Sequence, residues 1–292
     1  MRIAYLTQSY PPMVSGVAVV VQRLAECMTA RGHTVLVIAA SDRGDSYLTF
    51  KNNFLLLRLR SAVNNFRAQQ RFLVYPRNSL LKALQDFEPD IIHTHDVFQI
   101  GRLGAEFAQS MSIPIVGTLH GLPSFILSYL PNIPGLRSGA EAALWEYGRW
   151  SVRRYAAITT PTETISNLVR VMTKVLPHTI SNGVDLDAFK PRPFSRDEEL
   201  RLRERVGIPP DVPIILHVGR LDVDKRVEHV VIAVARAMLS NQAHLLIVGD
   251  GNEKPTLIKL SESLGIRERC HFPGFISVDD GLPDIYRIAS LL

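Results

Sequence analysis

The residues best suited to chemistry are two basic side chains, Arg220 and Lys225, which follow an apolar run, Ile214–Val218. The run predicts a buried strand, and apolar residues at helical spacing from Val227 onward predict a helix. Between them, Gly219 would let the backbone approach a ligand closely. A helix start adds unpaired N–H groups and a partial positive charge, so this turn suits a diphosphate. An isolated basic pair is more often a solvated loop edge, so the assignment depends on the rest of the chain.

Two other features lie where predicted strands end. His120 closes an apolar run over residues 113–120, and polar side chains at that end of a parallel sheet face the ligand crevice. Its position alone leaves a functional role and a capping role equally open. Gly249 begins a Gly-Asp-Gly turn between a strand and a helix. Because Lys254 replaces the last glycine of a dinucleotide fingerprint, this turn by itself indicates only a tight connection.

Two clusters could bind a metal, and neither has a complete set of ligands. Asp222 and Asp224 resemble a metal-binding Asp-x-Asp motif, but at a helix start carboxylates more often cap the helix and complement its dipole. His93 and His95 have no further ligands at a recognisable spacing, so they indicate a strand end. We therefore expect no bound metal.

Strands and helices alternate along most of the chain, which is typical of a parallel sheet with both faces covered. Residues 177–194 interrupt the alternation with three prolines, an Asn-Gly pair and several aspartates, a composition typical of a linker. The predicted fold class is therefore α/β, with two Rossmann-like parallel-sheet domains over residues 1–185 and 186–292. The second domain is expected to be incomplete, because a doubly wound sheet normally has more strands.

The composition is that of a soluble globular protein, since 46% of the 292 residues are hydrophobic and 21% are charged. No apolar run reaches the ~18 residues of a membrane span, and the first one is too short for a signal peptide. We expect a cytoplasmic protein in which Cys27 and Cys270 are buried free thiols. The net charge of +5 favours anionic partners.

Residues 51–85 hold seven basic and no acidic side chains, interleaved with Phe, Tyr and Leu. This mixture suits peripheral contact with an anionic membrane, and equally a solvated basic helix over a core stripe. We assign Arg67, Arg71 and, from the first loop, Tyr10 to an acceptor or membrane side. Nucleic acid is disfavoured as a partner, because no reading helix or known binding motif accompanies the charge.

Eight short motifs, in this order, jointly resemble one family. They are Pro11-Pro12 with Ser15-Gly16-Val17, Arg31-Gly32-His33-Thr34-Val35, Pro89-Asp90-Ile91-Ile92-His93-Thr94-His95, Thr118-Leu119-His120-Gly121, Ser181-Asn182-Gly183-Val184-Asp185, Val218-Gly219-Arg220-Leu221 with Lys225, Val248-Gly249-Asp250-Gly251, and Phe272-Pro273-Gly274-Phe275-Ile276. Each motif is modest, but together they span nearly the whole chain. The chain resembles the family 4 (group 1) retaining glycosyltransferases of the GT-B fold.

The resemblance implies two domains facing a cleft, with the acceptor mostly on the first and a nucleotide-sugar donor mostly on the second. The negative charge of the departing diphosphate would be stabilised by Arg220, Lys225 and the backbone at Gly16. In other enzymes a bound metal ion stabilises this charge. By resemblance, His120 lines the donor-sugar pocket and Ile276 lies where the nucleobase packs. Gly219 and Gly249 complete the donor-binding set. The resemblance implies no cofactor, no bound metal and no protein nucleophile, with the leaving phosphate taking the acceptor proton.

Two departures from the family pattern matter. Ser15 stands where the family usually has the first of two glycines. The family's Glu-x7-Glu element would follow the last residues, so we expect a C-terminally truncated chain.

The apolar loop over residues 122–136 includes Phe125 and Tyr129 and could guide a lipid acceptor, or simply pack under its domain.

We therefore expect a hexosyltransferase that moves a sugar, with retention, from a UDP- or GDP-sugar to a lipid or glycan acceptor. The alternative is a catalytically incomplete fragment or a non-catalytic binding subunit of the same fold. A nicotinamide-dependent oxidoreductase would rest on the strand–helix alternation alone, and the missing Gly-x-Gly-x-x-Gly fingerprint speaks against it.

Overall fold

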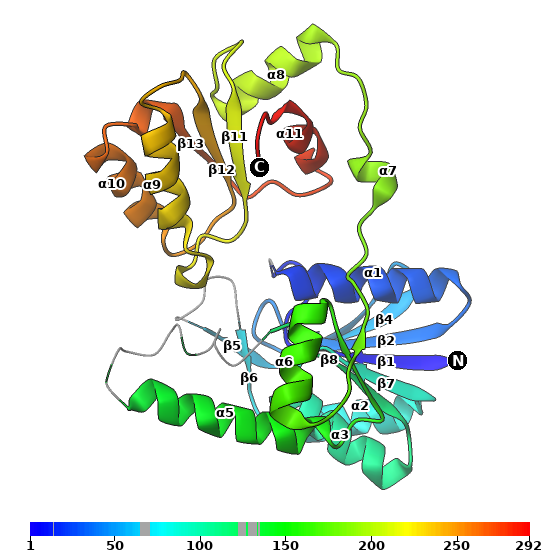
Figure 1. Ribbon diagram of the computed structural model, residues 1–292. Helices are drawn as coiled ribbons and strands as arrows, with labels where there is room; N and C mark the ends of the chain where they lie inside the picture. Colours follow the sequence, from blue (N-terminus) through cyan, green and yellow to red (C-terminus); the bar gives the residue numbers. More distant parts are fainter. Residues whose placement is uncertain (14, 65–70, 122–126, 128–132, 134) are drawn as a thin grey trace. The chain divides into compact units, whose positions relative to one another are not determined.

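The chain folds into two compact units, Met1–Gly183 and Val184–Leu292 (Figure 1). The structure is a computed structural model that describes residues 1–292 except 14, 65–70, 122–126, 128–132 and 134. The boundary expected after residue 185 falls two residues beyond the division between the units. Each unit has its own sheet and its own buried cores.

The N-terminal unit is built on an eight-stranded sheet whose strands run parallel except at one edge. In spatial order the strands are β10 (His178–Thr179), β9 (Ala157–Thr160), β8 (Ile115–Thr118), β7 (Ile91–Thr94), β1 (Arg2–Leu6), β2 (Thr34–Ala40), β4 (Phe54–Leu59) and the antiparallel β3 (Tyr47–Lys51). A two-stranded hairpin, β5 (Ser61–Val63) and β6 (Arg71–Leu73), lies outside this sheet. Because the parallel strands share one direction, the loops after β1, β7 and β8 leave the sheet at one edge.

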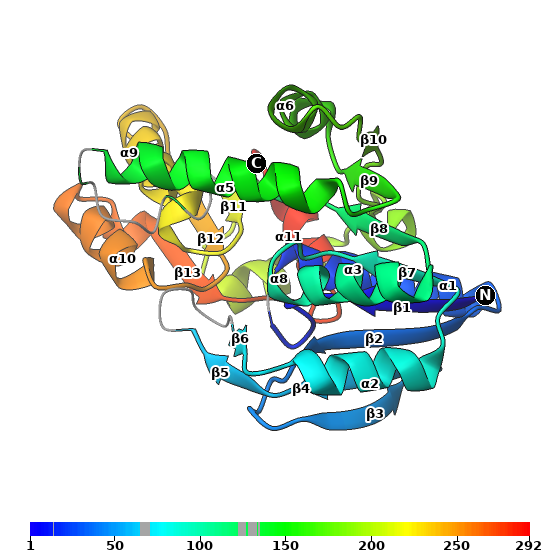
Figure 2. The same cartoon turned by 90° about the horizontal axis from the view of Figure 1, so that it is seen from below.

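Helices cover both faces of this sheet, which is why its strands are apolar on both sides. Ile3 and Tyr5 of β1 belong to the core shared with α1 (Gly16–Ala30), whereas Leu6 belongs to the core shared with α2 (Arg77–Phe87) and α3 (Gln99–Met111). Figure 2 shows α2, α3 and α5 (Leu136–Val152) in front of the sheet. The last helix of the unit, α6 (Glu163–Thr173), packs on β9 and β10.

The C-terminal unit is a smaller version of the same design. Its parallel sheet consists of β11 (Ile214–Val218), β12 (His244–Val248) and β13 (Cys270–Gly274). One face packs on α9 (Val227–Ala237) and α10 (Lys254–Ser263), and the other on α8 (Arg196–Val206) and α11 (Leu282–Ile288). After α11, Leu291 returns to the sheet and forms a parallel bridge with Ile215.

The segment between β2 and α2 differs most from the sequence analysis. A basic helix was one of two interpretations of residues 51–85. Only the part from Arg77 onward is helical (α2), and the residues before it include β4, β5 and β6. The cause lies in Phe54, Leu56 and Leu59, which are 0–3% exposed and make β4 an internal strand. A short apolar run of this kind cannot be distinguished from a buried helix by periodicity alone.

The two cysteines are free, but only Cys270 is buried. The expectation that Cys27 is also buried was wrong. The buried face of α1 consists of Ala18, Val21 and Ala25, and Cys27 lies on the other side of the helix.

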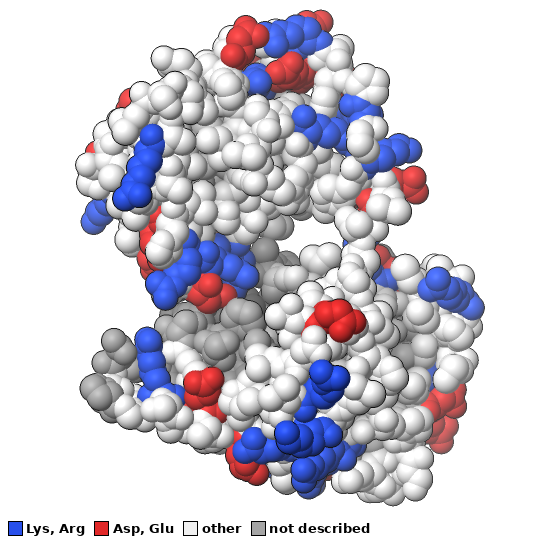
Figure 3. Space-filling view, viewed as in Figure 1, with Lys and Arg blue, Asp and Glu red and all other residues white. Residues whose placement is uncertain are grey.

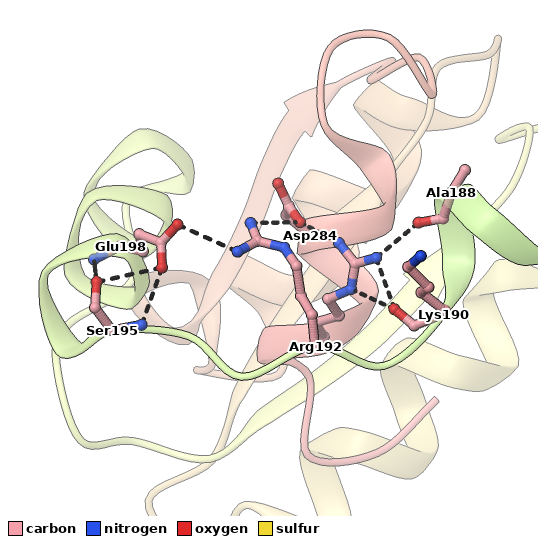
Figure 4. A network of polar contacts seen from close by, with 7 residues as sticks. Ala188, Lys190, Arg192, Ser195, Glu198 and Asp284 are labelled. Atoms are coloured by element: carbon pink, nitrogen blue, oxygen red, sulfur yellow. Dashed lines mark hydrogen bonds and ion pairs between the residues drawn. The ribbon is translucent and has the colours of Figure 1, made fainter.

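The segment that enters the C-terminal unit is fastened to that unit by a polar network (Figure 4). Arg192 pairs with Glu198 at the start of α8 and with Asp284 of α11, with N–O distances of 3.2 and 3.3 Å. Arg287 donates to the backbone carbonyls of Ala188 and Lys190, each at 2.7 Å. The residues from α7 (Leu186–Phe189) to α8 therefore belong to the C-terminal unit.

Candidate functional site

The loops that follow β11 and β12 are joined into one structure by backbone contacts. Leu221 N–H donates to the carbonyl of Asp250 at 2.9 Å, and Glu253 N–H donates to the carbonyl of Leu221 at 2.8 Å. Gly249 is needed there, because a Cβ on it would lie 1.8 Å from the Gly219 carbonyl oxygen. The Gly-Asp-Gly turn is thus more than a tight connection, which the sequence alone did not indicate.

Arg220 lies in this joined loop and is held by two carboxylates. Its Nη1 pairs with Asp222, and its Nη2 lies 3.2 Å from Asp224 Oδ2. The side chains of Arg220, Asp222 and Asp224 are 15%, 3% and 4% exposed. These two ion pairs fix the position of the guanidinium, and its Nε–H takes part in neither of them.

The helix-capping role expected for Asp222 was wrong. Asp222 is the N-cap of the short 3-10 helix η1 (Val223–Lys225), yet its side chain makes no capping hydrogen bond there. Its carboxylate is used to hold Arg220 instead. Among the described residues, no group of three or more His, Cys, Asp or Glu side chains could hold a metal ion.

Lys225 ends η1 and is exposed. Within the described part of the chain it forms no ion pair with a carboxylate. Burial, and secondarily the charge of Lys225, lowers the pKa of His217 on β11. In Figure 3, basic side chains gather at the end of the C-terminal unit where η1 lies. This end of the sheet therefore offers the fixed cation of Arg220 and the exposed cation of Lys225.

Ile276 lies beyond β13 and is 8% exposed, within the core that packs on α8 and α11. It also lines an open pocket of about 560 Å³ together with Phe275, Arg205 and the carboxylates Asp279 and Asp280. Phe275 is 52% exposed, so its ring contributes apolar surface at this pocket. The nucleobase role assigned to Ile276 remains a prediction.

The N-terminal unit brings three histidines together at the carboxyl ends of β7 and β8. His95 Nδ1 lies 2.8 Å from His120 Nε2, and His93 Nε2 lies 2.7 Å from Thr118 Oγ1. Burial lowers the pKa of His93 and of His120 to about 4, and that of His95 well below its usual value. All three rings are therefore neutral near pH 7. Sequence reasoning singled out His120 but left His95 as a strand end.

Gly16 is the first residue of α1 and is exposed, with no other atom within 4 Å of the position a Cβ would take. Ser15 caps the helix, because its Oγ accepts a hydrogen bond from Ala18 N–H at 3.0 Å. The first turn contains no acidic residue. No carboxylate in the first turn would repel an anion there, and the diphosphate role of the Gly16 backbone remains a prediction.

Tyr10 cannot contact an acceptor or a membrane in this structure, contrary to expectation. Its side chain is fully buried in the core beneath α1. The Arg58 guanidinium lies 5.1 Å from its ring centroid and donates to the carbonyls of Ala40 and Pro11. Arg58, which belongs to the basic segment 51–85, is 2% exposed and therefore cannot contact a membrane either.

Arg71 is part of the β5–β6 hairpin. Its Nε donates to Ser61 Oγ at 2.7 Å, so its guanidinium has a structural partner. The other residues assigned to the acceptor or membrane side, Arg67, Phe125 and Tyr129, lie outside the described residues.

Comparison with known proteins identifies the family. The sequence profile of Glycosyltransferase Family 4 matches residues 14–188, which is more than half of the chain. The chain belongs to Glycosyltransferase Family 4. A second profile, Glycosyl transferases group 1, matches residues 198–292 of this family 4 glycosyltransferase.

Two relatives are similar over most of the glycosyltransferase chain. An alpha-monoglucosyldiacylglycerol synthase from Streptococcus pneumoniae is 26% identical over 95% of it. A GDP-mannose-dependent alpha-mannosyltransferase from Mycobacterium tuberculosis is 29% identical over 88% of it. The chain spans 62% and 64% of the lengths of these two relatives.

Solved structures confirm the GT-B-like α/β fold class. Sucrose-phosphate synthase from Thermosynechococcus elongatus matches with a TM-score of 0.76 at 20% identity, over 99% of the glycosyltransferase chain and 73% of that structure. WaaG, a glycosyltransferase of lipopolysaccharide biosynthesis, matches with a TM-score of 0.68 at 18% identity, over 99% and 74%. None of the helices in the described ranges is long and apolar enough to cross a membrane.

Proposed function

We propose that this glycosyltransferase transfers a hexose from a UDP- or GDP-sugar to a lipid or glycan acceptor, with retention at the anomeric carbon. The observation that carries the donor site is the joined loop after β11 and β12. It holds the Arg220 guanidinium in place and leaves Lys225 exposed beside it. Family membership and the names of the relatives support a nucleotide-sugar donor.

The chemistry follows from the charge that develops on the leaving group. The bond from the anomeric carbon to the β-phosphate oxygen breaks, and the acceptor hydroxyl oxygen bonds to that carbon. The acceptor proton passes to the departing phosphate oxygen, so no protein base is required. Arg220 and Lys225 stabilise the diphosphate as its negative charge grows, and a preorganised donor of this kind contributes about 3–4 kcal/mol.

The names of two relatives specify alpha-linked products, which favours retention from an alpha-configured nucleotide sugar.

A lipid acceptor is suggested by one of these names, which includes the word diacylglycerol. A lipid acceptor agrees with the surface of the β5–β6 hairpin, where Val63, Phe72 and the following Tyr75 are 62%, 48% and 93% exposed. Arg60 and Arg77 flank these apolar side chains in the sequence and are exposed as well. Apolar rings beside basic side chains are suited to an anionic lipid surface.

Calorimetric titration with UDP and with GDP, in the absence of divalent metal, tests the donor site. We expect one of the two nucleotides to bind, and its affinity to fall about 10- to 100-fold in Arg220→Ala and in Lys225→Ala. Arg236→Ala is the matched control, because Arg236 is exposed in the last turn of α9, away from the joined loop. Equal affinities in all four proteins would refute the diphosphate assignment.

Transfer itself is tested by offering the nucleotide sugar with diacylglycerol or an oligosaccharide and following the product by mass spectrometry. The coupling constant of the anomeric proton then reports the configuration of the new linkage. A beta-linked product from an alpha-configured donor would contradict retention. Nucleotide binding without any transfer would favour the non-catalytic alternative.

A further inference from the structure

His120, which the family resemblance places at the donor sugar, contacts a second histidine. The His95 and His120 rings are stacked, with centroids 5.1 Å apart and planes 23° from parallel. His95 Nδ1 and His120 Nε2 are 2.8 Å apart, within hydrogen-bond distance. His95 follows β7 and His120 follows β8, so the pairing of two neighbouring parallel strands sets this contact. His95 is 6% exposed, whereas His120 is only half-buried.

Within the described part of the chain, the His95 side chain has a single hydrogen-bond partner, His120. Its Nε2 is buried and has no hydrogen-bond partner among the described residues. The other titratable groups that face its ring are His93 and Tyr5, with ring centroids at 4.3 and 6.0 Å. Burial keeps both His95 and His120 neutral near pH 7. Since each neutral imidazole carries one N–H, one ring of the pair must donate and the other must accept.

The two possible arrangements differ in the atom that is left without a partner. If His95 accepted at Nδ1, its proton would lie on Nε2 and a buried N–H would have no acceptor. If His95 donates from Nδ1, its Nε2 carries only a lone pair. Orphaned buried N–H groups are rarer in proteins than under-satisfied acceptors. We propose that His95 is a positioning residue that donates its Nδ1–H to His120 Nε2.

This hydrogen bond decides what His120 offers to a substrate. With Nε2 accepting, the proton of His120 must lie on Nδ1, and no described residue is given as an acceptor for this N–H. His120 therefore presents a neutral N–H donor rather than a base. If the proposed function holds, that donor recognises an oxygen of the donor hexose, and a deoxy sugar that lacks this hydroxyl should react more slowly.

The tautomer can be observed directly, without any turnover. Two-bond proton–nitrogen correlation spectra of the protein labelled with ¹⁵N-histidine distinguish protonated from unprotonated ring nitrogens. His120→Asn and His95→Phe assign the two rings. We expect His120 to be protonated at Nδ1 and His95 at Nδ1. A proton on His120 Nε2 would overturn the proposal, whether or not the protein transfers a sugar.

Kinetics test the positioning role. His95→Phe keeps a flat ring but removes the donor, and we expect kcat to fall about 10- to 100-fold, as when the outer partner of a functional histidine is lost. The KM for the nucleotide sugar should change much less, because the diphosphate is bound elsewhere. His95→Asn should restore most of kcat, since its amide can donate from near the position of Nδ1. Failure of Asn to do better than Phe would show a merely structural role.

The chain contains a matched control for these variants. His244 Nδ1 lies 2.8 Å from His271 Nε2, and these rings are also stacked with centroids 5.1 Å apart. This second pair lies on β12 and β13, away from the loops of the candidate site. His244→Phe should leave kcat unchanged, and an equal loss in His244→Phe and His95→Phe would contradict a specific role.

Discussion

Gly249 lies so close to the Gly219 carbonyl oxygen that a single added methyl group would be 1.8 Å from it. The φ angle of Gly249, +143°, is also one that side chains rarely adopt. The contact keeps the loop after β12 against the loop that holds Arg220. The proposed donor site therefore depends on a residue whose side chain takes no part in the chemistry.

Gly249→Ala should both destabilise the protein and weaken nucleotide binding. We expect the free energy of unfolding to fall by about 3 kcal/mol, from backbone strain and from the clash with a carbonyl that cannot move freely. Urea unfolding and calorimetric titration measure the two effects. Gly148→Ala within α5 is the control: no other atom lies within 4 Å of its Cβ position, so stability should rise by about 0.5–1 kcal/mol. A Gly249→Ala protein as stable as the native one would contradict the predicted strain.

His93 should make stability depend on pH. Burial lowers the pKa of His93 to about 4, while the unfolded chain titrates near 6.5. Between pH 4 and 6.5 the unfolded state binds more protons than the folded state. The contribution of neutral His93 to the free energy of unfolding is therefore complete above pH 6.5 and is lost as the pH falls toward 4. This contribution amounts to about 3 kcal/mol.

The measurement is the urea midpoint from pH 7.5 to 4.5 in the native protein and in His93→Gln, whose amide can still reach Thr118. The native protein should lose more stability than the variant on acidification. Asp96, whose pKa burial raises to about 6, acts in the opposite sense and is present in both proteins, so the comparison isolates His93. Parallel curves would exclude the effect.

Arg287→Ala should release the segment after α7 from the C-terminal unit. The guanidinium donates to the carbonyls of Ala188 and Lys190 and pairs with Asp284, so its loss leaves this stretch held mainly by Arg192. Limited chymotrypsin digestion should then cut after Phe189, the last residue of α7, several-fold faster than in the native protein. Arg201→Ala, on the exposed side of α8, should leave the rate unchanged. Equal rates in the two variants would show that Arg287 does not fasten the segment.

Tyr75→Ser should weaken binding to anionic membranes. Tyr75 is 93% exposed, so its ring is free to enter a lipid surface. Sedimentation with vesicles of phosphatidylglycerol should show reduced binding for this variant, and vesicles of phosphatidylcholine alone should bind little of either protein. Leu239→Ser removes an apolar side chain that is 88% exposed on the other unit, and it should bind like the native protein. Membrane binding unaffected by Tyr75→Ser would remove the hairpin from the proposal.

Most strands of the two parallel sheets could be predicted because their signal is local. Ile214–Val218 is an apolar run that ends at a glycine, and it matches β11 residue for residue. By contrast, β4 carries Arg58. The sequence predicts that this charged side chain is at the surface, but it is buried and donates hydrogen bonds to two backbone carbonyls. Those acceptors come from β2 and from the first loop, so nothing near Arg58 in the sequence reveals them.

The candidate site shows the same limit. Arg220 and Lys225 could be singled out from their spacing after a strand. That Asp222 and Asp224 hold Arg220 depends on side-chain directions within one turn, which the sequence leaves open. The role proposed for His95 depends on its contact with His120, which is 25 residues away and follows the neighbouring strand. The sequence does not show this contact.

The polar fastening of residues 188–192 has a consequence for building chimaeric enzymes. Because Ala188, Lys190 and Arg192 are bound to α8 and α11, they should travel with the C-terminal unit when donor halves are exchanged between relatives. The natural junction is then Gly183–Val184, upstream of α7, rather than the proline-rich stretch that looks like the linker. A fusion made at Pro193 would take the two partners of each bond from different parents, and the first half of the hybrid would then end in a segment without its native contacts.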